Sequence, residues 1–115
     1  MKIAIPVDEN TLESGVCMSF GRAPYYRLYD SQTQENEFIL NSAAQSAGGA
    51  GIRAAQLLAD RKPEVLLTPR CGQNAADVIL AAGIKIYKTE GASVKDNIDS
   101  FLAGKLEELS EIHAG

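Results

Sequence analysis

Tryptophan is absent from the 115-residue sequence, histidine occurs once and cysteine occurs twice. Two cysteines are too few for the disulfide framework of a small secreted domain. The single His113 lies close to the end of the chain and offers no evident base to a serine or cysteine nucleophile, which disfavours triad-type catalysis. Two-metal phosphoryl chemistry needs carboxylates clustered at strand ends. Asp8 follows the first predicted strand, but the strand 65–68 ends in Thr68-Pro69, where a second carboxylate would be needed. The sequence therefore predicts a protein that is not an enzyme.

Long hydrophobic runs and basic stripes are also missing. No apolar run approaches the ~20 residues that span a bilayer, and the segment Met1–Val7 lacks the residue order of a signal peptide. The formal net charge is −4, and lysine and arginine are scattered instead of gathered to neutralise phosphates. We therefore expect a cytoplasmic protein with reduced thiols that binds neither a membrane nor a nucleic acid.

The composition that remains, 45% hydrophobic and 23% charged, is typical of one compact domain. Short β-branched or alternating runs predict five strands, and apolar residues at helical spacing predict three helices. The expected strands are 2–7, 25–30, 37–40, 65–68 and 84–87, and the expected helices are 50–60, 74–82 and 93–102. We expect residues 1–104 to form a single α/β domain, followed by a C-terminal tail, 105–115, that adds one weak helix.

Right-handed crossovers order these strands in the sheet. They place strand 65–68 beside strand 2–7 and leave the hairpin of 25–30 and 37–40 on the other side. The prediction is a five-stranded mixed sheet of order 3-2-1-4-5 with helices on its faces, a three-layer αβα fold. Such sheets bind ligands outside the carboxyl ends of their parallel strands, near the point where the strand order reverses.

Three loops reach that end of the sheet, at 9–24, 42–51 and 69–73. They carry both cysteines, so Cys17 and Cys71 are expected to approach one crevice. Thiolates are soft ligands suited to copper(I) and iron-sulfur centres, and the neighbouring Met18 adds a soft thioether. The alternative interpretation is that both cysteines are small buried hydrophobes.

Glycine-rich segments open two helices at the same crevice. Ser46–Gly51 precedes one helix and Cys71-Gly72 precedes another, and helix N-termini favour anions through unpaired N–H groups and a partial positive charge. Arg22 and Arg70, on the flanking loops, complement an anion. The glycine run matches neither the dinucleotide fingerprint nor the P-loop. A tight helix entry without a ligand, and a site for a small molecule or nucleotide phosphate, stay open as alternatives.

Three motifs resemble those of a known family. Met1–Asp8 is similar to its opening strand, Phe20–Tyr25 to its most specific motif, and Ala82–Tyr87 with 93–106 to its closing strand and helix. Over nearly its whole length the chain resembles the dinitrogenase iron-molybdenum cofactor biosynthesis family. This resemblance implies a ribonuclease H-like fold and non-catalytic binding or carriage of a metal-sulfur cluster related to nitrogen fixation. The cluster would be the iron-molybdenum cofactor, a precursor or a related cluster, exchanged with metallocluster donor or acceptor proteins.

One position departs from the family pattern. The family commonly has histidine before Phe-Gly-Arg, where this chain has Ser19, and the loop 42–51 has no histidine either. Either Cys17 and Cys71 replace those donors with softer ones, or the metal function is altered or lost. We predict that the two cysteines ligate the metal and that seven further residues surround the cluster. These seven residues are Met18, Ser19, Arg22, Gly49, Gly51, Arg70 and Gly72.

The alternative function is a metal-free protein-interaction or regulatory module of the same fold, and the sequence leaves the oligomeric state open.

The long loop from Glu9 to Pro24 is predicted to be the least ordered internal segment, because a carrier must admit and release a bulky cluster. Gly15 and Gly21 would act as hinges around Cys17, with fast amide exchange over 10–18.

Overall fold

The computed structural model describes residues 1–109, and it contains five strands and three helices. The sheet is mixed, with strand order β3-β2-β1-β4-β5, which confirms the predicted order. β1, β4 and β5 run parallel to one another, while β2 pairs antiparallel with both β1 and β3. The elements are β1 (Lys2–Val7), β2 (Tyr25–Asp30), β3 (Asn36–Leu40), α1 (Ala50–Arg61), β4 (Val65–Thr68), α2 (Gln73–Ala81), β5 (Lys85–Lys88) and α3 (Val94–Leu102).

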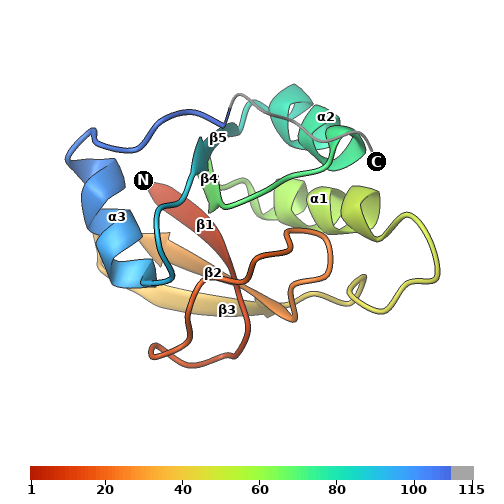
Figure 1. The fold of residues 1–115 in the computed structure, drawn as a ribbon, viewed down its shortest axis with the longest axis horizontal. Helices are drawn as coiled ribbons and strands as arrows, with labels where there is room; N and C mark the ends of the chain where they lie inside the picture. Colours follow the sequence, from red (N-terminus) through yellow and green to blue (C-terminus); the bar gives the residue numbers. More distant parts are fainter. Residues whose placement is uncertain (110–115) are drawn as a thin grey trace.

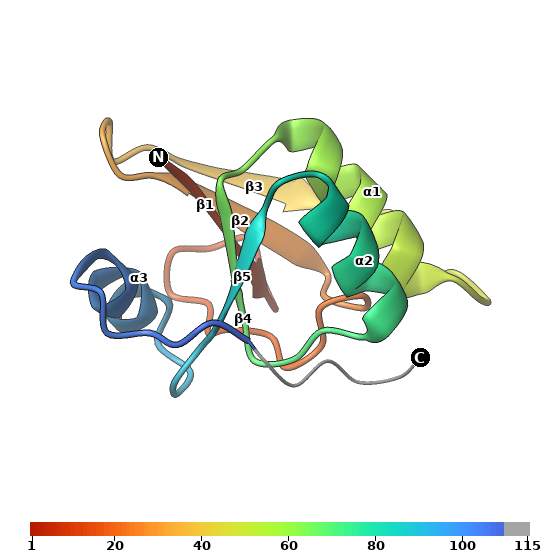
Figure 2. The same ribbon diagram turned by 90° about the horizontal axis from the view of Figure 1, so that it is seen from above.

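The helices cover both faces of the sheet. Figures 1 and 2 show α1 and α2 packed side by side on one face and α3 alone on the other. This arrangement confirms the three-layer αβα fold. The five predicted strands and the three predicted helices up to residue 102 are all present, and their bounds differ from the prediction by no more than about one residue at either end.

The two helical layers bury separate apolar clusters because successive strand residues point to opposite faces of the sheet. On β1, Ala4 belongs to the cluster under α1 and α2, whereas Ile3 and Ile5 belong to the cluster under α3. Leu66 and Leu67 of β4 divide in the same way. β1 and β4 have apolar residues at successive positions because both faces of these strands are buried.

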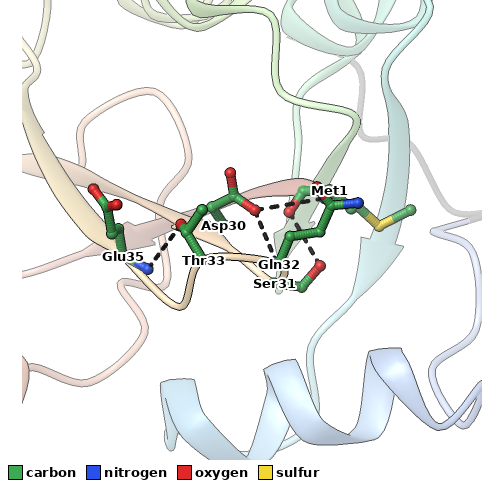
Figure 3. A network of polar contacts seen from close by, with 6 residues as sticks. All are labelled: Met1, Asp30, Ser31, Gln32, Thr33 and Glu35. Carbon is green, nitrogen blue, oxygen red and sulfur yellow. Dashed lines mark hydrogen bonds and ion pairs between the residues drawn. The ribbon is translucent and has the colours of Figure 1, made fainter.

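The β2–β3 turn is fixed by polar contacts around Asp30 (Figure 3). The Asp30 carboxylate accepts a hydrogen bond from the Gln32 amide at 2.9 Å and lies 3.7 Å from the amino group of Met1. The backbone N–H of Ser31 donates to the Met1 carbonyl at 2.9 Å. These contacts tie the turn to the beginning of β1. The Gln32 amide first, and then the Thr33 amide and the Met1 amino group, lower the pKa of Asp30.

Residues 105–109 do not form the weak helix that we expected. Leu106 is buried against the α3 side of the sheet, and the backbone pairs with β5 through Lys88 N–H to Glu107 and Leu109 N–H to Ile86. Pairing with an open sheet edge satisfies these backbone groups better than an isolated helical turn. The rest of the predicted tail, 110–115 with His113, lies outside the described residues, and the domain boundary at 104 stays a prediction. No helix within residues 1–109 is long and apolar enough to cross a membrane.

Candidate functional site

The predicted loops meet in a cavity of about 540 Å³. The cavity lies where the segment 18–22, the start of α1 and the start of α2 come together. Of the nine residues predicted to form the site, all except Cys17 line this cavity. Those that line it are Met18, Ser19, Arg22, Gly49, Gly51, Arg70, Cys71 and Gly72.

A buried polar network holds the segment 20–23 in place. The Tyr26 hydroxyl donates to the carbonyl of Phe20, and the Asn41 side-chain amide donates to the carbonyls of Gly21 and Ala23 at 3.0 and 2.9 Å. Tyr26 and Asn41 are almost fully buried, so these bonds are shielded from water. The network fixes the backbone of the Phe-Gly-Arg-Ala motif as one wall of the cavity.

Gly21 lies in close backbone contact with α1. A Cβ atom at Gly21 would lie 2.9 Å from Cα of Gly51 and 3.1 Å from its nitrogen. Only glycine permits the backbone of segment 20–23, the wall segment, to approach the start of α1 this closely. Gly21 is therefore a packing contact, and a Cβ atom at Gly15 would lie 3.3 Å from the Ala92 carbonyl oxygen. The role of the two glycines as hinges stays a prediction.

Both helix N-termini at the cavity have free N–H groups. Neither α1 nor α2 has a side-chain cap, and neither carries an acidic residue in its first turn. The N-cap residue of α1 is Gly49, in the left-handed conformation with φ of 70°, and that of α2 is Gly72. Unpaired N–H groups at two helix starts give this part of the cavity a positive potential.

Two arginines add full positive charges, and none of the described carboxylates, in residues 1–109, lines the cavity. The Arg22 guanidinium donates to the carbonyls of Ala44 and Ser46 at 2.9 and 3.2 Å, so it also ties the wall segment to the loop before α1. The Arg70 side chain is exposed and makes no hydrogen bond or ion pair within residues 1–109. On a chain with a net charge of −4, this cavity is a local positive site suited to an anion.

The two thiols approach the same buried region, although only Cys71 lines the cavity. Burial raises the pKa of the Cys71 thiol to about 11, and burial and the neighbouring Asp8 raise the pKa of Cys17. The Tyr26 hydroxyl also has a raised pKa, first from burial and then from Cys17 and Cys71, which belong to the same buried cluster. At neutral pH both cysteines are therefore thiols, and metal ligation by either must release a proton.

The Cys71 thiol makes stability depend on pH. Its pKa is raised above the ordinary value of 9.0, so it stabilises the fold below pH 9, and this contribution is lost as the pH rises to about 11. We expect the free energy of unfolding to fall by about 2 kcal/mol over that window, and Cys71→Ala to show a smaller fall. Urea titrations of both proteins at pH 8.5 and 10.5 test this. Equal falls in the two proteins would contradict it.

Ser19 has a structural role at the beginning of segment 20–23. Its hydroxyl accepts a hydrogen bond from the Arg22 amide at 3.1 Å, closing the turn that starts the wall segment. Met18, beside it, is 66% exposed, so its thioether is available at the cavity mouth. Within residues 1–109, no three His, Cys, Asp or Glu side chains lie together where they could hold a metal ion.

The loop 9–24 is attached to the domain by more backbone hydrogen bonds than the sequence predicts. The amide of Val16 donates to the Ala92 carbonyl at 2.9 Å, and that of Cys17 donates to Pro6 at 2.8 Å. We therefore expect fast amide exchange over 10–13 and slow exchange at Val16 and Cys17, instead of fast exchange throughout 10–18. Hydrogen exchange measured by NMR on the metal-free protein tests this. Fast exchange at both Val16 and Cys17 would show that these hydrogen bonds open readily.

Several cavity residues were not predicted. Phe20 and Gly21 belong to the Phe-Gly-Arg-Ala-Pro motif, and that membership was a usable signal. Ile52 and Asn74 line the cavity from the first turns of α1 and α2, one or two residues after the predicted glycines. Asn41, which supports the cavity wall without lining the cavity, had no sequence signal, because its partners lie 18 to 20 positions away in the chain.

Comparisons with known proteins agree with this fold. The family described as dinitrogenase iron-molybdenum cofactor matches residues 1–104. An uncharacterized protein of Methanocaldococcus jannaschii is 32% identical over 112 residues, covering 95% of this chain and 92% of the relative. Both matches span the three cavity-forming segments.

Solved structures of similar proteins share the whole fold. The apo form of the orange protein from Desulfovibrio gigas has a TM-score of 0.89 and 34% identity, covering 95% of this chain and 92% of its own. A Thermotoga protein described as a candidate NifB protein has a TM-score of 0.83 and 36% identity, covering 96% and 95%. The chain therefore belongs to the dinitrogenase iron-molybdenum cofactor family, a family of cofactor-binding and cofactor-carrying domains.

Proposed function

We propose that this protein binds and carries an anionic metal-sulfur cluster, containing iron and molybdenum, in the cavity between segment 18–22 and the starts of α1 and α2. The observation that carries the proposal is the charge of the cavity, which has two arginines, two uncapped helix N-termini and no carboxylate from the described part of the chain. Charge-assisted hydrogen bonds from such donors suit sulfide and oxide ligands of a cluster. In this role the protein holds its cargo without catalysing a reaction.

The donors present favour an assembled cluster over a bare ion. The cavity offers one thiol, Cys71, and one thioether, Met18, whereas a bare thiophilic ion takes about four protein ligands. A cluster that brings its own sulfide ligands needs only one or two donors from the protein. We assign Cys71 as the direct ligand, and Cys17 as a second ligand that turns toward the cavity when the cluster binds.

The exposure of the cavity wall supports carriage. Five of the lining residues are exposed, so a cluster can reach the cavity without any opening of the hydrophobic core. These residues are Met18, Ser19, Arg22, Gly49 and Arg70. A relative that was solved as an apo form is consistent with reversible loading in the family. Donor and acceptor proteins would meet the same exposed rim.

Anaerobic reconstitution with iron, sulfide and thiomolybdate tests the proposal. After desalting, we expect stoichiometric iron and molybdenum per chain and absorption above 300 nm. A protein without either would support the alternative function, a metal-free interaction or regulatory module.

The two cysteines differ in their expected effects. Cys71 lines the cavity and Cys17 does not, so Cys71→Ala should weaken cluster retention about tenfold and Cys17→Ala less. The readout is metal per chain after dialysis against a chelator, with Ala92→Ser as an exposed control substitution on another loop. If the double variant Cys17→Ala/Cys71→Ala retains as much metal as the parent, the ligand assignment is wrong.

A further inference from the structure

A second cavity, of about 520 Å³, adjoins the proposed cluster site. Met18 and Arg70 line both cavities and separate them. The second cavity continues between the strand ends of β4 and β5, where it is lined by Pro69, Lys88 and Thr89. Nothing in the proposed carriage of a cluster uses this space.

Thr89 is the unusual residue of the second cavity. It is only 7% exposed, and its hydroxyl has no hydrogen-bond partner within residues 1–109. A buried hydroxyl without a partner is destabilising, and proteins rarely leave one in this state without a reason. Thr89 lines the cavity, but its hydroxyl oxygen has less than 1 Å² of accessible surface, so a ligand bound there supplies the missing partner only after the Thr89 side chain turns toward it.

The backbone around Thr89 is rigid. The Thr89 amide donates to the Thr68 carbonyl at 3.2 Å, which continues the pairing of β4 with β5. The buried Asn97 side chain accepts a hydrogen bond from the Glu90 amide at 2.7 Å and donates to the Ser93 carbonyl at 2.7 Å. The backbone of the cavity wall is therefore preformed, and only the Thr89 side chain has to turn when a ligand binds.

The chemistry of the lining indicates what the second cavity would hold. Arg70 and Lys88 supply two positive charges, and no carboxylate of residues 1–109 lines the cavity. The rest of the wall is mainly apolar and includes Val16, Pro69 and Leu109. An anionic head group would lie near the two cations and Thr89, while a short hydrocarbon part would cover the apolar wall.

We propose that the second cavity binds a small organic carboxylate with a short alkyl chain. The carboxylate accepts hydrogen bonds from Arg70, Lys88 and the Thr89 hydroxyl. The alkyl chain lies against Val16, Pro69 and Leu109. The proposal does not depend on cluster binding, because it is tested on the metal-free protein.

Calorimetric titration of the metal-free protein with acetate, butyrate and hexanoate tests the class of ligand. Each added methylene that is buried should tighten binding by about fourfold, so hexanoate should bind best. Inorganic phosphate should bind more weakly than hexanoate because it lacks the apolar part. Equal affinities for acetate, hexanoate and phosphate, or no binding of any of them, would overturn the proposal.

Substitutions at Thr89 separate a binding role from a structural one. Thr89→Val keeps the shape and removes the unpaired hydroxyl, so it should weaken hexanoate binding about tenfold without lowering the melting temperature of the free protein. Thr89→Ser should restore most of the affinity. Lys88→Gln should weaken binding, whereas Lys85→Gln, at the other end of β5, should not. A lower melting temperature for Thr89→Val with unchanged hexanoate affinity would show that Thr89 is purely structural.

Discussion

Substituting Gly21 by alanine is expected to disrupt the cluster site and to destabilise the protein by about 3 kcal/mol. The new Cβ atom would lie 2.9 Å from Cα of Gly51, a backbone atom that no side-chain rotation can move away. Either segment 18–22 or the start of α1 must shift. Such a shift also strains the hydrogen bond from Asn41 to the Gly21 carbonyl. Thermal unfolding and metal uptake, measured on the same sample, report both effects.

Gly48 provides a matched control for this substitution. It lies in the loop before α1, and a Cβ atom there would have no neighbour within 4 Å. Gly48→Ala should therefore stay within about 0.5 kcal/mol of the parent and load normally. If Gly21→Ala unfolds at the parent's temperature and takes up the same amount of metal, the close contact does not shape the site.

Removing the two arginine charges should have the largest effect on cluster binding. Arg70 is exposed and has no partner within residues 1–109, so Arg70→Gln removes a charge with little structural cost. Arg22 also holds the loop before α1 through Ala44 and Ser46, so Arg22→Gln should add a geometric effect. We expect a loss of at least tenfold from Arg70→Gln and of about 100-fold from the pair.

The positive charge of the cavity also predicts that cluster retention depends on the salt concentration. Because the two arginines lie at an exposed rim, added salt should weaken retention of an anionic cluster in the parent. The double arginine variant should show much less change. Arg70→Lys keeps the charge and loses the planar fork, so it should fall between Arg70→Gln and the parent.

The sheet order could be predicted because few topologies fit the buried runs. β1 and β4 are apolar on both faces, so they had to be central, and handedness then fixed the position of β5. The same topology brought the three loops to one edge, which is why most of the predicted site residues line one cavity. Those inferences needed only the course of the backbone.

Side-chain direction and long-range bonding could not be predicted in this way. Cys17 and Met18 are neighbours, yet Met18 lines the cavity and Cys17 is buried behind it. The anchoring of the wall by Tyr26 and Asn41 joins residues that no local pattern relates. The strand-like pairing of 107–109 with β5 similarly depends on an open sheet edge that exists only after folding.

The measurement that tests the central claim most directly is metal bound per chain after anaerobic reconstitution with iron, sulfide and thiomolybdate. It compares the parent, Arg22→Gln/Arg70→Gln and Arg61→Gln, which loses one charge at the far end of α1. We predict stoichiometric iron and molybdenum in the parent and in Arg61→Gln, and almost none in the double variant. Equal loading of all three proteins, or no loading of the parent, would contradict an anionic cluster held by the charge of this cavity.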